Sequence, residues 1–133
     1  MLSDRLITLS SAPVWKYLGE ELKFAENGKS EVYLKIKDEF LQHFGNVHGG
    51  ILATLLDSSM AAAVNSMLDD NVFTVTAEMN IQYIRPATGS FLIGRGDVIK
   101  NGKTITSCKS EIFNEKDELI AFATGTFVNK LKT

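Results

Sequence analysis

The sequence has little of what several classes of protein need. Its single cysteine, Cys108, cannot form a disulfide within the chain, so nothing ties the fold to an oxidising compartment and we expect a cytoplasmic protein. Its two histidines have no companion cysteines or clustered acids, which leaves no metal site to propose. No run approaches the roughly 18 apolar residues of a membrane span, and the first residues are charged, so we expect a soluble, unprocessed chain with no membrane partner.

Positive charge is also scarce. The 133 residues carry 14 Lys and Arg against 16 Asp and Glu, which gives a formal net charge of −2. No stripe of basic residues stands out, so nucleic acid is not an expected partner. The chain has 44% hydrophobic residues and no repeat, low-complexity segment or linker, so residues 1–133 are expected to form a single domain.

Hydrophobic periodicity predicts an α+β fold. A loosely helical piece covers residues 2–18, and two alternating runs flank Asn27-Gly28, a dipeptide typical of a two-residue hairpin turn. A helix that is apolar nearly all round is predicted over residues 49–68. Four further strands, joined as a meander with a second tight turn at Asn101-Gly102, are predicted over residues 73–84, 91–100, 104–113 and 119–128. These elements favour an antiparallel β-sheet wrapped around one long central α-helix.

The predicted helix contains one acid, Asp57, about two turns beyond its start. A buried carboxylate is costly unless it is hydrogen-bonded or neutralised, and this position is too deep in the helix for capping. On position alone, the side chain could equally reach the surface or bond to Ser58 or Ser59. Asp57 is therefore a candidate that needs a second observation.

The tripeptide His48-Gly49-Gly50 at the helix start supplies that observation. Glycines let another group approach the backbone, and the N-terminal N–H groups of a helix point outward toward oxyanionic atoms. The Gly49 amide and the Asp57 carboxylate lie about 12 Å apart along one helix, at about 1.5 Å per residue. Because one chain cannot easily bring both to one reacting carbonyl, we predict a homodimer whose two composite sites each take Gly49 from one chain and Asp57 from the other.

Two stretches carry a resemblance to a known family. The sequence "NVHGGILATLLDSSMAAA", with nine residues from its His to its Asp, and the later "TAEMNIQYIRPA" resemble the hotdog-fold acyl-CoA thioesterases of the PaaI-like group, in the 4-hydroxybenzoyl-CoA thioesterase superfamily. The likeness extends over nearly the whole chain. It implies a hotdog fold, hydrolysis of an acyl-CoA to a free acid and CoA, and no cofactor beyond the CoA of the substrate. It also implies a dimer of dimers.

The resemblance implies roles for individual residues. The Gly49 N–H polarises the thioester carbonyl, and Asp57 of the partner subunit activates the attacking water or attacks directly. Thr76 helps to hold that water, and His48 supports the oxyanion side. Cys108 has no neighbouring His in the sequence and is expected to pack in the core rather than act as a nucleophile.

One position departs from the family pattern. Relatives carry an Asn six residues before the His, whereas this sequence has Gln42, whose longer amide could replace that second donor; Asn46 is the other candidate. The residues implied in binding the substrate and its CoA are Gly50, Asn46, Tyr83, Arg85, Lys100 and Lys103, with Phe44 as a further wall residue. Two alternative functions stay open at this point: a hotdog enoyl-thioester hydratase or dehydratase, and a non-catalytic acyl-CoA-binding module.

Overall fold

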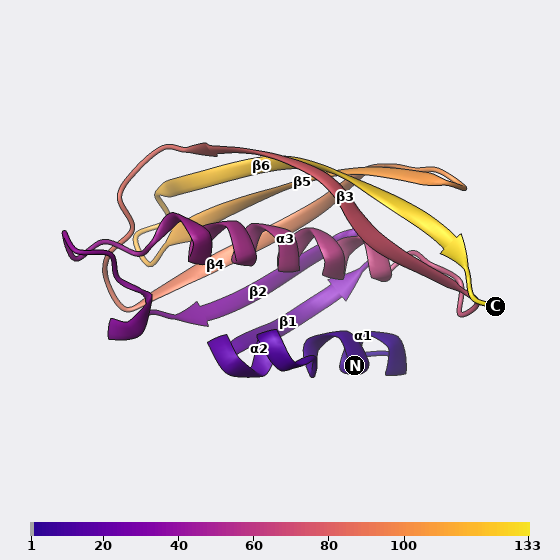
Figure 1. Cartoon of the computed structure of the whole chain (residues 1–133), viewed down its shortest axis with the longest axis horizontal. Coiled ribbons are helices and arrows are strands. Elements are labelled where there is room, and N and C mark those ends of the chain that lie inside the picture. The colour runs from indigo at the N-terminus through magenta and orange to yellow at the C-terminus, as the bar shows by residue number, and fades with distance from the viewer. Residues whose placement is uncertain (1) are drawn as a thin grey trace.

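The computed structural model describes residues 2–133 as ten elements, which are six strands in one curved sheet, three α-helices and one 3-10 turn. The elements are α1 (Asp4–Ser10), α2 (Pro13–Leu18), β1 (Glu20–Glu26), β2 (Lys29–Lys35), the 3-10 turn η1 (Asp38–Phe40), α3 (Gly49–Asn65), β3 (Val72–Tyr83), β4 (Phe91–Asn101), β5 (Ile105–Asn114) and β6 (Leu119–Leu131). All neighbouring strands are antiparallel, in the order β1-β2-β4-β5-β6-β3. Figure 1 shows the sheet curving around α3, with α1 and α2 beside β1. The predicted α+β architecture is confirmed.

The predicted four-strand meander is wrong in one respect. Strands β4, β5 and β6 are consecutive neighbours, but β3 pairs with β6 and forms the far edge of the sheet. The segment after β3 crosses the end of the sheet, because the N–H groups of Ile84 and Arg85 donate to the Ile120 carbonyl, while the Ser90 carbonyl accepts from Ile36. The chain therefore crosses from the side of the sheet that holds β3 and β6 to β2 before β4 begins.

The two predicted hairpin turns have different outcomes. Asn27 and Gly28 both have positive φ angles, 51° and 79°, as a type I′ turn requires, and they link the paired residues Glu26 and Lys29. In the second hairpin, the Gly102 N–H donates to the Ile105 carbonyl at 2.9 Å, so Lys103 and Thr104, rather than Asn101-Gly102, form the tip.

Helix α3 forms the core with the concave face of the sheet. Its Leu55, Leu56 and Met60 are fully buried, and it ends at Asn65, three residues before the predicted end. The helix lies close to β4, since a Cβ added to Gly96 would collide with the Ser59 carbonyl oxygen. No helix within residues 2–133 is long and apolar enough to cross a membrane.

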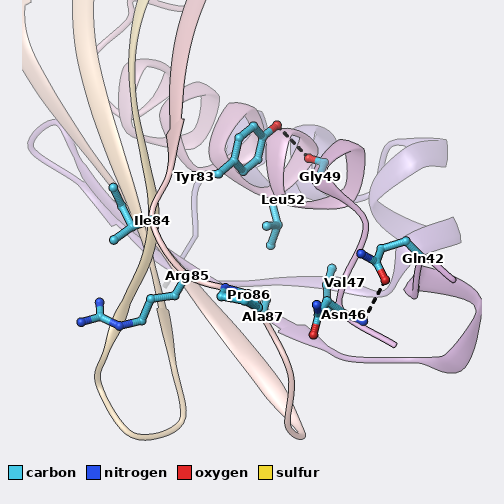
Figure 2. A pocket seen from close by; sticks show the side chains of 10 residues that line it. All are labelled: Gln42, Asn46, Val47, Gly49, Leu52, Tyr83, Ile84, Arg85, Pro86 and Ala87. Carbon is cyan, nitrogen blue, oxygen red and sulfur yellow. Dashed lines mark hydrogen bonds between the residues drawn. The ribbon is translucent and has the colours of Figure 1, made fainter. Parts of the chain in front are cut away.

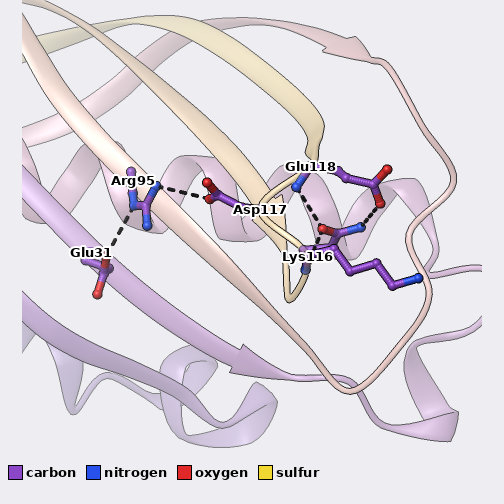
Figure 3. A network of polar contacts seen from close by, with 6 residues as sticks. Glu31, Arg95, Lys116, Asp117 and Glu118 are labelled. Carbon is purple, nitrogen blue, oxygen red and sulfur yellow. Dashed lines mark hydrogen bonds and ion pairs between the residues drawn. The ribbon is translucent and has the colours of Figure 1, made fainter.

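A polar network crosses the outer face of the sheet, as Figure 3 shows. The Arg95 guanidinium lies 3.2 Å from Glu31 and 3.9 Å from Asp117, and it packs 5.0 Å from the centre of the Phe113 ring. These contacts connect β2, β4 and the β5–β6 turn. Because the ion pairs are substantially exposed, each contributes about 1 kcal/mol or less to stability.

Candidate active site

The start of α3 presents one free backbone donor. His48 is the N-cap residue, and its Nδ1 accepts a hydrogen bond from the Gly50 N–H at 2.9 Å. The His48 carbonyl accepts from the Ile51 N–H at 3.0 Å. Within residues 2–133, no acceptor takes the Gly49 N–H. Since the Gly50 N–H is occupied by His48, Gly49 is the donor that points outward.

A cavity of about 320 Å³ opens beside this donor (Figure 2). Its volume falls within the range of small-molecule pockets. The residues that line it are Gln42, Asn46, Val47, Gly49, Leu52, Tyr83, Ile84, Arg85, Pro86 and Ala87. The fold therefore brings together five of the residues singled out from the sequence, namely Gln42, Asn46, Gly49, Tyr83 and Arg85.

Gln42 reaches this cavity with its amide nitrogen unused by the protein. Its Oε1 accepts from the N–H groups of Phe44 at 2.7 Å and Asn46 at 3.2 Å, which fixes the side-chain amide and organises the loop before α3. No acceptor within the described chain binds its Nε2. Tyr83, at the end of β3, also reaches the helix start, and its hydroxyl donates to the Gly49 carbonyl at 3.0 Å (Figure 2).

Asp57 lies elsewhere on α3 and is held by one partner. The Thr76 hydroxyl donates to its Oδ1 at 2.7 Å, whereas Ser58 and Ser59 bond to other groups. Within residues 2–133, no Lys, Arg or His pairs with this half-buried carboxylate. A carboxylate with one hydroxyl donor and no cation keeps lone pairs available for a proton or a water molecule.

Strand β3 carries a contact to each of these two regions. Thr76 touches Asp57, and Tyr83 touches Gly49, although side chains seven positions apart on a regular strand face opposite sides. A β-bulge between Thr76 and Glu78 restores the match, because the extra residue shifts the alternation by one. Both side chains therefore face α3.

Besides Gly50, whose N–H is occupied by His48, three predicted binding residues lie outside the cavity at the helix start. Phe44 is 78% exposed, and its ring is tilted by 39° against that of His43 with ring centres 4.1 Å apart. Lys103 lines a different cavity together with Val72 at the beginning of β3, and Lys100 lies on an exposed part of β4. Within one chain, these groups do not join the Gly49 region.

Glu20 is a buried acid that the sequence reasoning missed. It is the first residue of β1 and only 6% exposed, and its Oε1 accepts from Ser58 at 2.8 Å. Burial raises the pKa of Glu20 to about 7, against the lowering effect of the Ser58 hydrogen bond, and the charge of Asp57 raises it further. The available signal was strand alternation, which turns one of Glu20 and Glu21 inward.

Cys108 is also buried and lies within the electrostatic reach of Asp57. Burial, followed by the charges of Asp57 and Asp97, raises the pKa of the Cys108 thiol to about 12. A neutral, buried thiol is a poor nucleophile, which fits a packing role.

Comparison with known proteins identifies the family. The sequence pattern of the thioesterase superfamily matches residues 44–121, which is more than half of the chain. The chain belongs to the thioesterase superfamily. Human acyl-coenzyme A thioesterase 13 is similar to this thioesterase, with 30% identity over 92 residues that cover 68% of this chain and 65% of the human protein.

Solved structures of thioesterases agree with this assignment. A thioesterase family protein from Silicibacter pomeroyi matches with a TM-score of 0.89 and 26% identity, over 94% of each chain. A hypothetical thioesterase from Streptococcus pneumoniae, whose crystal structure was determined with coenzyme A, matches with a TM-score of 0.78 and 25% identity, over 85% of this chain and 87% of that one. The hotdog fold implied by the sequence resemblance is confirmed.

Proposed function

We propose that this thioesterase hydrolyses acyl-CoA thioesters to a carboxylic acid and CoA, at two composite sites in a homodimer. The observation that carries the proposal is the separation of two complementary half-sites. A free oxyanion donor, the Gly49 N–H, lies at the start of α3, and an acid without a cation, Asp57, lies two turns further along the same helix.

The helix start supplies electrostatic stabilisation. The Gly49 N–H and the Gln42 amide nitrogen hydrogen-bond to the thioester oxygen, and both bonds strengthen as negative charge develops on that oxygen. His48 supports this arrangement by occupying the Gly50 N–H and fixing the first turn of the helix. Asn46, which lines the same cavity, is the alternative second donor.

Asp57 of the partner subunit acts as the base. It takes a proton from water while the water oxygen bonds to the carbonyl carbon; the C–S bond then breaks, and the proton passes to the CoA sulfur. In the nucleophilic route, an Asp57 oxygen bonds to the carbonyl carbon and the C–S bond breaks, which releases CoA as a thiolate; water then hydrolyses the anhydride, which frees the acid, restores Asp57 and supplies the proton for the CoA sulfur. In both routes the Thr76 hydroxyl holds the carboxylate in position.

The free edge of β3 supports a dimer with this geometry. This strand has 12 residues, has β6 as its one neighbouring strand among residues 2–133, and exposes the apolar side chains of Phe73 and Val75. A long, apolar edge strand is a template for pairing with another chain. Antiparallel pairing of two β3 strands, centred between Met79 and Asn80, sets Thr76 opposite Tyr83 of the partner subunit and therefore joins one Asp57 to the partner's helix start.

Two basic residues line cavities that could receive the CoA phosphates. Arg85 lines the cavity at the helix start and donates to the Leu119 carbonyl at 2.8 Å, and Lys103 lines a second cavity with Val72. Arg and Lys side chains bind phosphates through charge-assisted hydrogen bonds. Lys100 is the further candidate, and the stacking of two dimers into a tetramer stays a prediction.

Thiol release from a panel of acyl-CoAs tests the reaction. The wild type should release CoA from at least one acyl class, and Asp57→Asn should lower that rate by about 10²- to 10⁴-fold, the usual contribution of a positioned acid-base group. Retained folding of the variant is checked by its thermal unfolding. A wild type that binds acyl-CoA without releasing thiol would contradict hydrolysis and favour a binding module; a change in enoyl absorbance would favour a hydratase.

Mixing two inactive variants tests the composite site. Asp57→Asn damages one half-site and Gln42→Ala the other, so a mixed dimer has one doubly damaged site and one intact site. If subunits exchange at random, about half of the dimers are mixed, and activity should return to roughly a quarter of the wild-type value. No recovery after confirmed exchange would show that each site is built from a single chain.

A further inference from the structure

Glu20 has a geometry that packing alone does not explain. Its carboxyl group is inside the protein, where the Ser58 hydroxyl donates to Oε1 at 2.8 Å. The second oxygen, Oε2, is fully buried and has no hydrogen-bond partner in residues 2–133. Buried polar atoms are normally paired, and leaving one unpaired is unfavourable. A glutamine or an apolar residue would fill the same space without a buried charge.

Its location links Glu20 to the proposed base. Ser58, which holds Glu20, is the residue directly after Asp57 on α3. After burial and the Ser58 hydrogen bond, the charge of Asp57 is the third influence on the pKa of Glu20, and it raises that pKa. Thr76 and Ser58 therefore hold the two carboxyl groups: the Thr76 hydroxyl bonds to Asp57 on α3, and the Ser58 hydroxyl, from the next residue of α3, bonds to Glu20 on β1.

The other elements around Glu20 place no cation on it. Leu34 is its partner on β2, and the inward residues of α2 are Trp15 and Leu18. Lys16 at the end of α2 is exposed, and Lys37, whose Nζ lies beside Gly19, makes no ion pair with Glu20 within the described chain.

The charged groups of α1 are also engaged or distant. Arg5 donates to Asn65 and to the Asp69 and Val72 carbonyls, and Asp4 is exposed. On β1 itself, the neighbouring Glu21 is exposed and lies 3.8 Å from Lys23. Asp57 is thus the ionisable group to which Glu20 is electrostatically coupled.

We propose that Glu20 is a positioning residue that acts through Asp57, by placing a second, switchable carboxyl group behind the proposed base. When Glu20 is protonated, it adds no charge beside Asp57. When Glu20 loses its proton, the added negative charge opposes the charge on Asp57, which increases the tendency of Asp57 to take a proton from water. Ionisation of Glu20 therefore makes Asp57 a stronger base, and turnover rises with pH across the neutral range.

The expected size of the effect is modest. One pKa unit corresponds to about a tenfold change in the proton affinity of a carboxylate beside a like charge. The rate of a general-base step follows only a fraction of that change. Turnover on the alkaline side should therefore exceed turnover on the acid side by about three- to tenfold. This inference rests on the proposed hydrolysis, and its test distinguishes the failure of one from the failure of the other.

The test is the pH dependence of kcat, measured from about pH 5.5 to about pH 8.5, for the acyl-CoA that the wild type hydrolyses best. The wild type should show an inflection near the pKa of about 7 that burial gives Glu20. Glu20→Gln keeps the acceptor for Ser58 but cannot ionise, so it should lose this inflection and stay at the acid-side rate. The matched control is Glu21→Gln, on the exposed face of the same strand, which should keep it.

Ser58→Ala gives an independent readout if Glu20→Gln does not fold. Because the Ser58 hydrogen bond lowers the pKa of Glu20, its removal should move the inflection to higher pH. An unchanged inflection in either Glu20→Gln or Ser58→Ala, with active enzyme, would overturn the role of Glu20 and leave hydrolysis intact. A wild type without thiol release would overturn the proposed function and, with it, this role.

Discussion

The buried position of Glu20 predicts that stability falls as pH rises, whereas turnover is expected to rise, and stability can be measured without substrate. Burial raises the pKa of Glu20 from an ordinary 4.5 to about 7, so between these values the unfolded chain loses a proton that the folded chain keeps. Because the folded state binds more protons, the free energy of unfolding of the wild type falls as pH rises through this window. Glutamine has the shape of the neutral acid and does not titrate. Glu20→Gln should therefore resemble the wild type at pH about 5 and be more stable at pH about 8.

The magnitude follows from the width of the window. Each pH unit between the two pKa values is worth about 1.4 kcal/mol, so the advantage of Glu20→Gln should grow by about 3 kcal/mol from the acid to the alkaline end. Urea unfolding of both proteins at the two pH values, at one ionic strength and one protein concentration, measures this difference. An equal stability difference between the two proteins at both pH values would refute the reasoning, since it would show that Glu20 keeps an ordinary pKa in the folded state.

Two further predictions concern the support of Asp57. Thr76→Val removes the hydroxyl that bonds to the Asp57 carboxylate and should slow thiol release by about 10- to 100-fold, the equivalent of a hydrogen bond to a charged group, whereas Thr76→Ser should keep most of the activity. Gly96→Ala places a methyl group against the Ser59 carbonyl and should reduce the free energy of unfolding by about 1–3 kcal/mol, as measured by urea unfolding; a neutral effect would show that α3 can move away from β4 at no cost.

Local sequence signals were sufficient wherever a few neighbouring residues determine the structure. Asn27 and Gly28 tolerate the positive φ angles that a two-residue turn needs, so the first hairpin was predictable. The continuous apolar surface of α3 was predictable for a similar reason, since a helix without a polar face must be surrounded by protein.

Long-range pairing was not predictable in the same way. The partner of β3 is set by the path of residues 84–90 across the end of the sheet, and no pattern within β3 distinguishes β6 from β4 as its neighbour. Glu20 was missed for a related reason. Which of Glu20 and Glu21 points inward depends on the register of β1 against β2, and a slip of one residue would exchange them.

The candidate site was predictable as a set of residues but not as a set of contacts. Gly49 and Asp57 stand out in the sequence by type and spacing, and Gln42 is implied by the family resemblance. The bond from Thr76 to Asp57, in contrast, depends on a β-bulge that turns the first part of β3 toward the helix. Bulges change the face of a side chain without a strong composition signal, so this contact needed the structure.

The support around Asp57 shows why a helix in the core can carry the proposed base. Two buried strand hydroxyls hold the backbone on either side of it: Ser110 on β5 donates to the Leu56 carbonyl at 3.0 Å, and Ser30 on β2 donates to the Ser59 carbonyl at 2.6 Å. Asp57 itself emerges toward the edge strand β3, where a second chain would place the thioester. Catalytic groups need placement to within about 0.5 Å, and a side chain between two anchored carbonyls on a rigid helix meets that need better than one on a loop. The same anchoring fixes the backbone at Ser58, whose hydroxyl bonds to Glu20, directly beside Asp57, and the proposed coupling between the two acids depends on this packing of α3 against the sheet.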